Sequence, residues 1–257
     1  MRKNRKIKKI TTLIFILPLS LIVSYAAFET NINLKAKGNI KENKELIDKQ
    51  IPQDKLLFWA DVDGVENTKT LLKDKSINQK DGTIYGATYE KNALLLDGVD
   101  DYVDIGYAGY DFKNTISYVI YVKLYQNSHS CIFGNWESAG SGLWQNPTIS
   151  FDIYDTVLNE YVEATSPINI DTNTYYTVIG IQDENIIKLY IDGKLMATQN
   201  VTNMNVSSRN VIIGGNPNGD VIGDTSNMSF KEAMLYDRAL TEEEVSIITK
   251  AFHQKYE

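Results

Sequence analysis

The chain has 257 residues, of which 26 are basic and 33 acidic, and its net charge is −7 at pH 7. Because nucleic-acid binding rests on neutralising phosphates, this acidity disfavours DNA or RNA as a partner. The single cysteine, Cys131, excludes an internal disulfide, and the two histidines are too few for a zinc cage. Stability must therefore come from an apolar core, with or without a bound metal.

The N-terminal segment has the pattern of an export signal. Six basic residues and no acid lie within positions 1–9, and a largely apolar run follows from Ile10 to Phe28. Ser24-Tyr25-Ala26 places small residues where a signal peptidase cleaves, and its surroundings resemble the leaders of Gram-positive surface proteins. We expect residues 1–28 to be an apolar helix, either a signal peptide or a retained membrane anchor. The remaining chain would then be secreted or held at a bacterial cell surface, touching the membrane only through this segment.

Residues 29–54 are polar and rich in Lys, Glu and Asn, which predicts a spacer. Residues 55–257 are enough for one β domain. Apolar segments rich in β-branched and aromatic residues predict its strands. These strands are expected at 56–60, 83–89, 93–96, 102–105, 115–124, 148–154, 160–165, 175–181, 186–191, 194–198, 210–214 and 230–236.

Two Asp-Gly pairs predict tight turns. Asp192-Gly193 separates two alternating runs and predicts a three-stranded meander over 174–201. Asp97-Gly98 likewise predicts a hairpin between an apolar run and the strand at 102–105. Thr241 and Glu244 form a capping box, so a short helix should close the chain, with Val245 on its apolar stripe.

Four segments in order resemble the laminin-G-like jelly roll of the concanavalin A-like lectin and glucanase superfamily. They are 57–59 with 74–83, then 96–103, 189–193, and 230–240 with 242–245. The resemblance implies an all-β fold, a two-sheet antiparallel jelly-roll sandwich over residues 55–257. In one departure from the family pattern, Lys231 stands where an acid usually precedes the glutamate of the last motif.

The same resemblance implies a calcium site. Asp74, Asn78 and Asp81 would present oxygens from an early loop, and Glu232 would approach from the late strand. Alternatively, these residues form turns or an exposed charge. A second acidic group follows the first Asp-Gly pair and is interpreted mainly as structural; it consists of Asp97, Asp100, Asp101 and Asp104.

Carbohydrate binding is the ligand hypothesis that the aromatic residues favour. Trp136 and Trp144 lie in a Gly/Ser-rich stretch, 134–146, that is expected to be a loop. Sugars stack on aromatic rings and bond to amides such as that of Asn135. One of the two indoles could instead cap the core. Tyr107 and Tyr110 are further exposed candidates.

Catalysis is disfavoured because a retaining glycosidase of this fold carries two carboxylates on one strand face. In the strand at 148–154, Asp152 has only Ser150 and Tyr154 two positions away. We therefore expect a non-catalytic, exported or surface-attached module whose rim loops bind a glycan or another extracellular polymer. A protein–protein adhesion module of the same fold, or a glycoside hydrolase, remains as an alternative.

Overall fold

The structure is a computed structural model that describes residues 43–63, 67–112, 114–136, 139–204 and 206–256. The chain divides into two units, Met1–Gln50 and Ile51–Glu257. In the first unit, residues 43–48 are helical, and the predicted N-terminal apolar helix lies outside the described residues. None of the described helices combines the length and the apolar character needed to cross a membrane.

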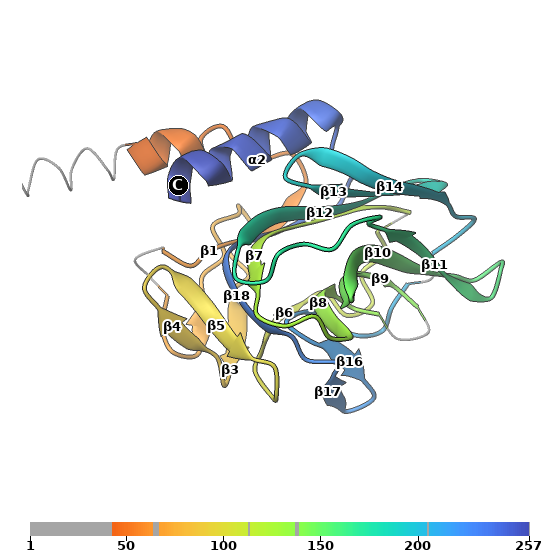
Figure 1. Cartoon of the computed structure of the whole chain (residues 1–257), viewed down its shortest axis with the longest axis horizontal. Coiled ribbons are helices and arrows are strands. Elements are labelled where there is room, and N and C mark those ends of the chain that lie inside the picture. The colour runs from red at the N-terminus through yellow and green to blue at the C-terminus, as the bar shows by residue number, and fades with distance from the viewer. Residues whose placement is uncertain (1–42, 64–66, 113, 137–138, 205, 257) are drawn as a thin grey trace, which may run out of the picture. The chain divides into compact units, whose positions relative to one another are not determined.

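The second unit is a sandwich of two antiparallel eight-stranded sheets (Figure 1). The first sheet has the order β14-β13-β12-β7-β18-β5-β4, and β1 also pairs with β18. Its strands are β1 (Leu56–Asp61), β4 (Thr88–Glu90), β5 (Ala93–Asp97), β7 (Thr115–Leu124), β12 (Tyr175–Asp183), β13 (Ile186–Ile191), β14 (Lys194–Asn200) and β18 (Asn227–Tyr236).

The second sheet has the order β11-β10-β9-β8-β15-β6-β3-β2. Its strands are β2 (Leu71–Leu72), β3 (Gly82–Tyr85), β6 (Tyr102–Gly106), β8 (Ser130–Gly134), β9 (Ser141–Asn146), β10 (Thr148–Asp155), β11 (Glu160–Thr165) and β15 (Val211–Ile213). A small hairpin, β16 (Asn216–Asn218) with β17 (Val221–Gly223), stands apart from both sheets. The predicted all-β, two-sheet jelly-roll sandwich is confirmed.

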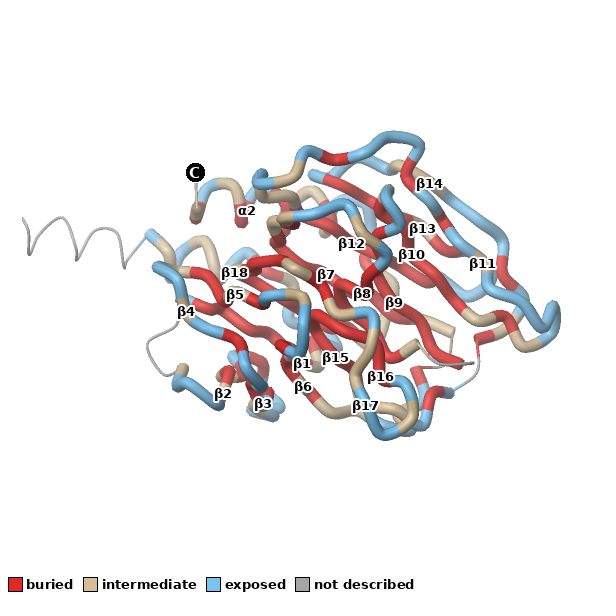
Figure 2. Tube along the Cα trace, turned by 60° about the horizontal axis from the view of Figure 1, so that its bottom comes forward, coloured by how far each residue is buried: buried red, intermediate tan, exposed pale blue. Residues whose placement is uncertain are grey.

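The core lies between the sheets, and strand alternation explains how it forms. In β7, every second side chain from Ile116 to Leu124 joins the core cluster. On the facing side of the sandwich, Phe151 packs over Gly180, where an added Cβ would lie 2.4 Å from the ring. Only glycine fits at that point of closest approach. Figure 2 shows the central strands buried along most of their length, while exposed residues gather on the edge strand β14 and on β11.

The meander at 174–201 is confirmed as β12, β13 and β14. Asp192 and Gly193 have φ angles of 47° and 74°, as a type I′ turn requires. The hairpin predicted at Asp97-Gly98 is wrong. Strand β5 pairs with β18 and β4 in the first sheet, whereas β6 pairs with β15 and β3 in the second. The turn therefore carries the chain from one sheet to the other, a connection that the local sequence does not distinguish from a hairpin.

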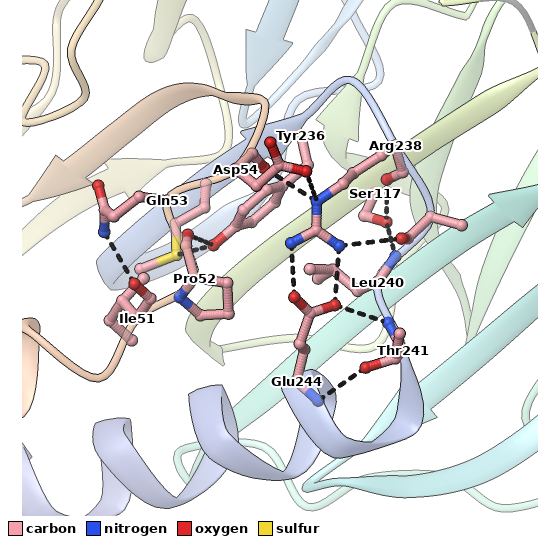
Figure 3. Close-up of polar contacts among 12 residues, drawn as sticks. Ile51, Pro52, Gln53, Asp54, Ser117, Tyr236, Arg238, Leu240, Thr241 and Glu244 are labelled. Atoms are coloured by element: carbon pink, nitrogen blue, oxygen red, sulfur yellow. Dashed lines mark hydrogen bonds and ion pairs between the residues drawn. The ribbon is translucent and has the colours of Figure 1, made fainter.

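The predicted C-terminal helix is α2 (Glu242–Tyr256). Its capping box forms, because the Glu244 amide donates to Thr241 Oγ1 and the Thr241 amide donates to Glu244 Oε2 (Figure 3). Arg238 holds the same Glu244 carboxylate with two hydrogen bonds of 2.7 and 2.6 Å. Its Nε also donates to the carbonyl of Asp54, so residues assigned to the spacer contact the end of the sandwich.

Helix α2 covers part of the outer face of the first sheet. Phe252 and Tyr256 pack against Tyr121 of β7, with ring centroids 5.7 and 5.5 Å apart. Beneath the helix, Lys255 donates to Glu232 at 2.6 Å and to Asp61 at 2.8 Å. This buried ion network ties the C-terminus to β18 and β1.

Candidate functional site

The outer face of the second sheet carries the candidate site, and strand register builds it. In β10, Phe151 and Ile153 face the core, so Asp152 between them points outward. Antiparallel pairing with β11 sets Glu163 directly opposite Asp152. Directly opposed Cβ atoms lie roughly 4.5–5.5 Å apart, so the two carboxyl groups are neighbours. As the sequence indicated, Asp152 has no acidic partner in its own strand. The adjacent strand β11 supplies Glu163, a pairing that residue spacing within β10 could not reveal.

Three aromatic rings gather beside this acid pair. Trp136 lies at the centre, 4.6 Å from the ring of Trp144 and 4.1 Å from that of Tyr161. We call Trp136, Trp144, Tyr161, Asp152 and Glu163 the aromatic–acid cluster. The cluster combines stacking surfaces with carboxyl groups, the two chemistries that sugar binding uses.

Trp144 does not lie in a loop, contrary to the expectation for residues 134–146. Residues Ser141–Asn146 form β9, and Trp144 is 2 % exposed. Its pairing with Ser150 of β10 places its indole on the outer face beside Asp152. Trp136, in the segment between β8 and β9, is partly exposed and covers it. Trp144 is thus the buried base of the cluster, and Trp136 and Tyr161 offer the accessible rings.

Three buried polar atoms in the cluster have no hydrogen-bond partner among the described residues: Asp152 Oδ1, Trp136 Nε1 and Trp144 Nε1. They border a hollow of about 60 Å³ that is also lined by His129, Asn146, Thr148, Ser150, Glu163 and Thr165. An unmade hydrogen bond at a buried group costs on the order of 1–3 kcal/mol. This part of the face therefore carries an unfavourable energy that a polar ligand would relieve.

Asp152 is set up to carry a proton. Burial raises the pKa of its carboxyl group to about 8, the nearby Glu163 charge raises it further, and a hydrogen bond with Ser150 opposes the shift. Below that pH the group is a neutral acid that can both donate and accept. Together with the two indole N–H groups, it matches the paired donors and acceptors of a sugar hydroxyl.

A larger hollow of about 500 Å³ opens on the same outer face, nearer the β16–β17 hairpin. Tyr102 and Asp104 of β6 line it, with Arg209, Asn210 and Ile212 from around β15. Asn210 donates to Asp104 at 2.9 Å, which fixes the polar wall. Strands β10 and β6 are four positions apart in the sheet, so the two hollows are separated by roughly 20 Å. The residues of this second hollow come from three separate segments, so no local sequence pattern indicates them as one site.

The other three predicted ligand-binding residues form hydrogen bonds within the chain. Asn135 is 2 % exposed, and its Oδ1 accepts from the Ser141 amide, which closes the segment between β8 and β9. Tyr107 and Tyr110 are only partly exposed, and their hydroxyls donate to the Leu57 carbonyl and to the Asp237 carboxylate. Burial raises the pKa of Tyr107 to about 12. Asn135 thus shapes the segment that carries Trp136, whereas Tyr107 and Tyr110 shape a loop outside the aromatic–acid cluster.

The predicted calcium ligands also have partners within the chain. Asp74 accepts from the amides of Trp59, Ser76 and Lys80, and Asp81 pairs with Lys73 at 2.7 Å. These hydrogen bonds fold the early loop by themselves.

The remaining two predicted ligands are also engaged. Asn78 donates its amide hydrogens to two backbone carbonyls, and Glu232 accepts from Lys255, Tyr256 and Trp59 Nε1. Calcium at these four residues stays a prediction.

A separate acidic cluster could hold a metal ion. Carboxylate oxygens of Asp97, Asp100 and Asp101 lie within 4.8 Å of one another in the turn between β5 and β6. Burial, with the charges of the two neighbouring acids, raises the pKa of Asp101. However, Asp97 accepts from the Val99 amide and Asp101 from the Asp97 amide, so the turn is already supported without a cation.

Comparison with known proteins agrees with this architecture. Residues 97–246 match the family model for the concanavalin A-like lectin/glucanases superfamily. The chain therefore belongs to that superfamily. The comparison with curated proteins found no match.

Two solved structures illustrate the shared fold. A Trypanosoma rangeli sialidase in complex with sialic acid has a TM-score of 0.63 at 15 % identity, covering 86 % of this chain and 39 % of the sialidase. The receptor-binding domain of botulinum neurotoxin D has a TM-score of 0.59 at 15 % identity, covering 78 % of this chain and 53 % of that domain. At this identity the likeness concerns the fold alone, and the chain spans about half or less of either structure.

Proposed function

We propose that the chain is an exported, non-catalytic carbohydrate-binding module of a bacterial surface, and that it holds its ligand against the outer face of the second sheet. The lectin-like fold supports this proposal. So does the N-terminal sequence, whose basic and apolar pattern is that of an export signal. The face, rather than the rim loops expected from sequence, would be the binding surface.

The observation that carries the proposal is the group of three unpartnered polar atoms beneath accessible rings in the aromatic–acid cluster. A sugar stacked on Trp136 and Tyr161 would place one hydroxyl in the hollow, within reach of Asp152 and the indole N–H groups. The hollow of about 60 Å³ accommodates such a substituent but not a whole ring. The larger hollow near β6 would contact a second part of the same short oligosaccharide.

A glycan array probed with the full chain tests the proposal, with Trp136→Ala as the diagnostic variant. We expect binding to fall roughly fivefold to a hundredfold in this variant, if a sugar gains about as much as the 1–3 kcal/mol that a base gains by stacking on an aromatic ring. Leu195→Ala, exposed on β14 of the other sheet, is the matched control and should bind normally. Equal binding by both variants would refute the proposed face. Capture of a protein but no glycan would favour the adhesion alternative.

One observation favours a second candidate, a glycoside hydrolase: an acid of raised pKa lies opposite a second carboxylate. This combination is found in enzymes that cleave glycosidic bonds. We prefer binding because Asp152 is 6 % exposed and its hollow is too small to admit a glycosidic bond with a ring on either side. New reducing ends formed from an oligosaccharide by the wild-type chain, and not by Asp152→Asn, would establish hydrolysis.

A further inference from the structure

The outer face of the first sheet holds a third hollow, of about 210 Å³, with a chemistry opposite to that of the aromatic–acid cluster. Three lysines line it, Lys91, Lys123 and Lys231, although the chain as a whole is acidic. Tyr125, Tyr175 and Ser229 form its floor, and the turn between β4 and β5 forms one wall. We call this hollow the lysine pocket.

Strand register builds the floor of the lysine pocket. Tyr175 of β12, Lys123 of β7 and Ser229 of β18 lie directly opposite one another in three adjacent strands. Their side chains therefore share one face. The hydroxyls of Tyr175 and Tyr125 lie 2.8 and 3.1 Å from Ser229 Oγ, so the floor is a connected group of hydroxyls.

A β-bulge in β18 delivers the third lysine. The register shifts between Phe230, which pairs with Val122, and Glu232, which pairs with Tyr121. Lys231 is the inserted residue, and the bulge lets both Lys231 and Glu232 contact groups on the outer face. Glu232 enters the ion network under α2, while Lys231 Nζ lies 4.5 Å from the centre of the Tyr175 ring. This is the position at which the sequence departs from the family pattern by replacing an acid with a lysine.

Two of the three lysines hold charge that is available to a ligand. Among the residues that the structure describes, neither Lys91 nor Lys123 forms an ion pair with a carboxylate. Lys123 Nζ instead lies 4.9 and 5.1 Å from the rings of Tyr125 and Tyr175. The Tyr175 ring thus lies within cation–π distance of both the Lys123 and the Lys231 ammonium groups. Ammonium groups fixed in this way attract a negatively charged group and do not have to be reoriented.

We propose that the lysine pocket binds the anionic group of an acidic saccharide, a carboxylate or a sulfate, at a site separate from the aromatic–acid cluster. The lysines would neutralise the charge, and the pocket's hydroxyls would bond to the sugar. Glu90, which also lines the pocket, accepts hydrogen bonds from sugar hydroxyls but repels a small, fully charged ion. This mixture of charges favours a saccharide over inorganic phosphate. The inference rests on the proposed function and extends it to an acidic saccharide, held at the lysine pocket independently of the aromatic–acid cluster.

Titration calorimetry of the full chain tests the proposal with three probes: tetragalacturonate, a heparin-derived tetrasaccharide and neutral maltotetraose. The variant Lys123→Gln/Lys231→Gln should raise the Kd for a charged probe about tenfold or more. The control, Lys194→Gln/Lys250→Gln, makes the same change in net charge at exposed positions and should leave that Kd unchanged. Lys91→Gln, at an exposed turn residue, should weaken binding by a smaller factor and avoids any defect in folding.

The outcomes separate this pocket from the aromatic–acid cluster. Trp136→Ala should retain binding of the charged probe. This expectation does not depend on whether the glycan array shows that Trp136 binds neutral sugars. Tighter binding of the carboxylate or of the sulfate probe would identify the anionic group. Failure of both charged probes to bind, equal weakening in the control, or loss of charged-probe binding in Trp136→Ala would each overturn the proposal.

Discussion

Two buried carboxylates on opposite outer faces of the sandwich differ in how completely they are satisfied. Glu232, under α2, accepts hydrogen bonds from Lys255, Tyr256 and Trp59. Asp152, in the aromatic–acid cluster, has an oxygen that finds no hydrogen-bond partner in the described parts of the chain. A fully bonded buried acid stabilises the fold only as part of its network, whereas an incompletely bonded one adds a cost that a ligand would offset. The difference distinguishes a structural acid from a candidate functional one.

The first prediction concerns the ion network under α2 and has the largest expected effect. Lys255→Met should lower the free energy of unfolding by roughly 3–5 kcal/mol, because it leaves Glu232 buried without a cation, while Asp61 keeps only Lys75 at 2.9 Å. The side chain of Lys255 is only 2 % exposed, so water cannot replace it. Urea denaturation measures the loss, and Lys250→Met, exposed on the same helix, is the control. If Lys255→Met and Lys250→Met lowered the free energy of unfolding by the same small amount, the ion network would not stabilise the fold.

The second prediction concerns Asp152 and pH. The folded chain holds a proton on Asp152 up to about pH 8, whereas the unfolded carboxyl loses it near pH 3.8. The free energy of unfolding should therefore fall as the pH rises through this window. Burial also raises the pKa of Glu232 to about 7, so this acid contributes to the same fall. Asp152→Asn should remove the Asp152 contribution and leave the variant more stable than the wild type by roughly 1–3 kcal/mol at pH 9.

Thermal or urea unfolding at several pH values checks the second prediction. Glu163→Gln is the matched control, since Glu163 is exposed and opposite the same position. It removes one source of the raised pKa and should shift the slope to lower pH without abolishing it. An unchanged slope in Asp152→Asn would mean that the pKa of Asp152 is not raised in the folded state and would contradict the prediction.

The third prediction concerns the helix cap and has the smallest effect. Thr241→Ala removes the oxygen that accepts the Glu244 amide, so it should destabilise the fold by about 1 kcal/mol. Arg238 still holds Glu244 in that variant, which limits the damage. The midpoint of urea denaturation reports the change, with Lys250→Ala as the control in the same helix. If Thr241→Ala lowered the free energy of unfolding as much as Lys255→Met, the exposed helix cap would contribute as much as the buried ion network, contrary to the prediction.

Local sequence patterns determined the elements and the class of fold. The meander around Asp192-Gly193, the central strand at 115–124 and the capped C-terminal helix could all be predicted, because turn chemistry, alternation and capping act over a few residues. The buried cysteine also behaves as a small core-like residue, with no exposed surface. These features follow from neighbours along the chain.

Only the tertiary structure decided which strands pair and which side chains become neighbours on the outer faces of the two sheets. The turn at Asp97-Gly98 joins two sheets instead of two paired strands, since an Asp-Gly turn fits either connection. Glu163 meets Asp152, and Lys123 meets Tyr175, only through register between strands. Register depends on which face of each strand is buried against distant segments. For that reason the sequence indicated Trp136 and Trp144 as residues of interest, but the acid pair beside them and the lysine pocket emerged only from the folded sandwich.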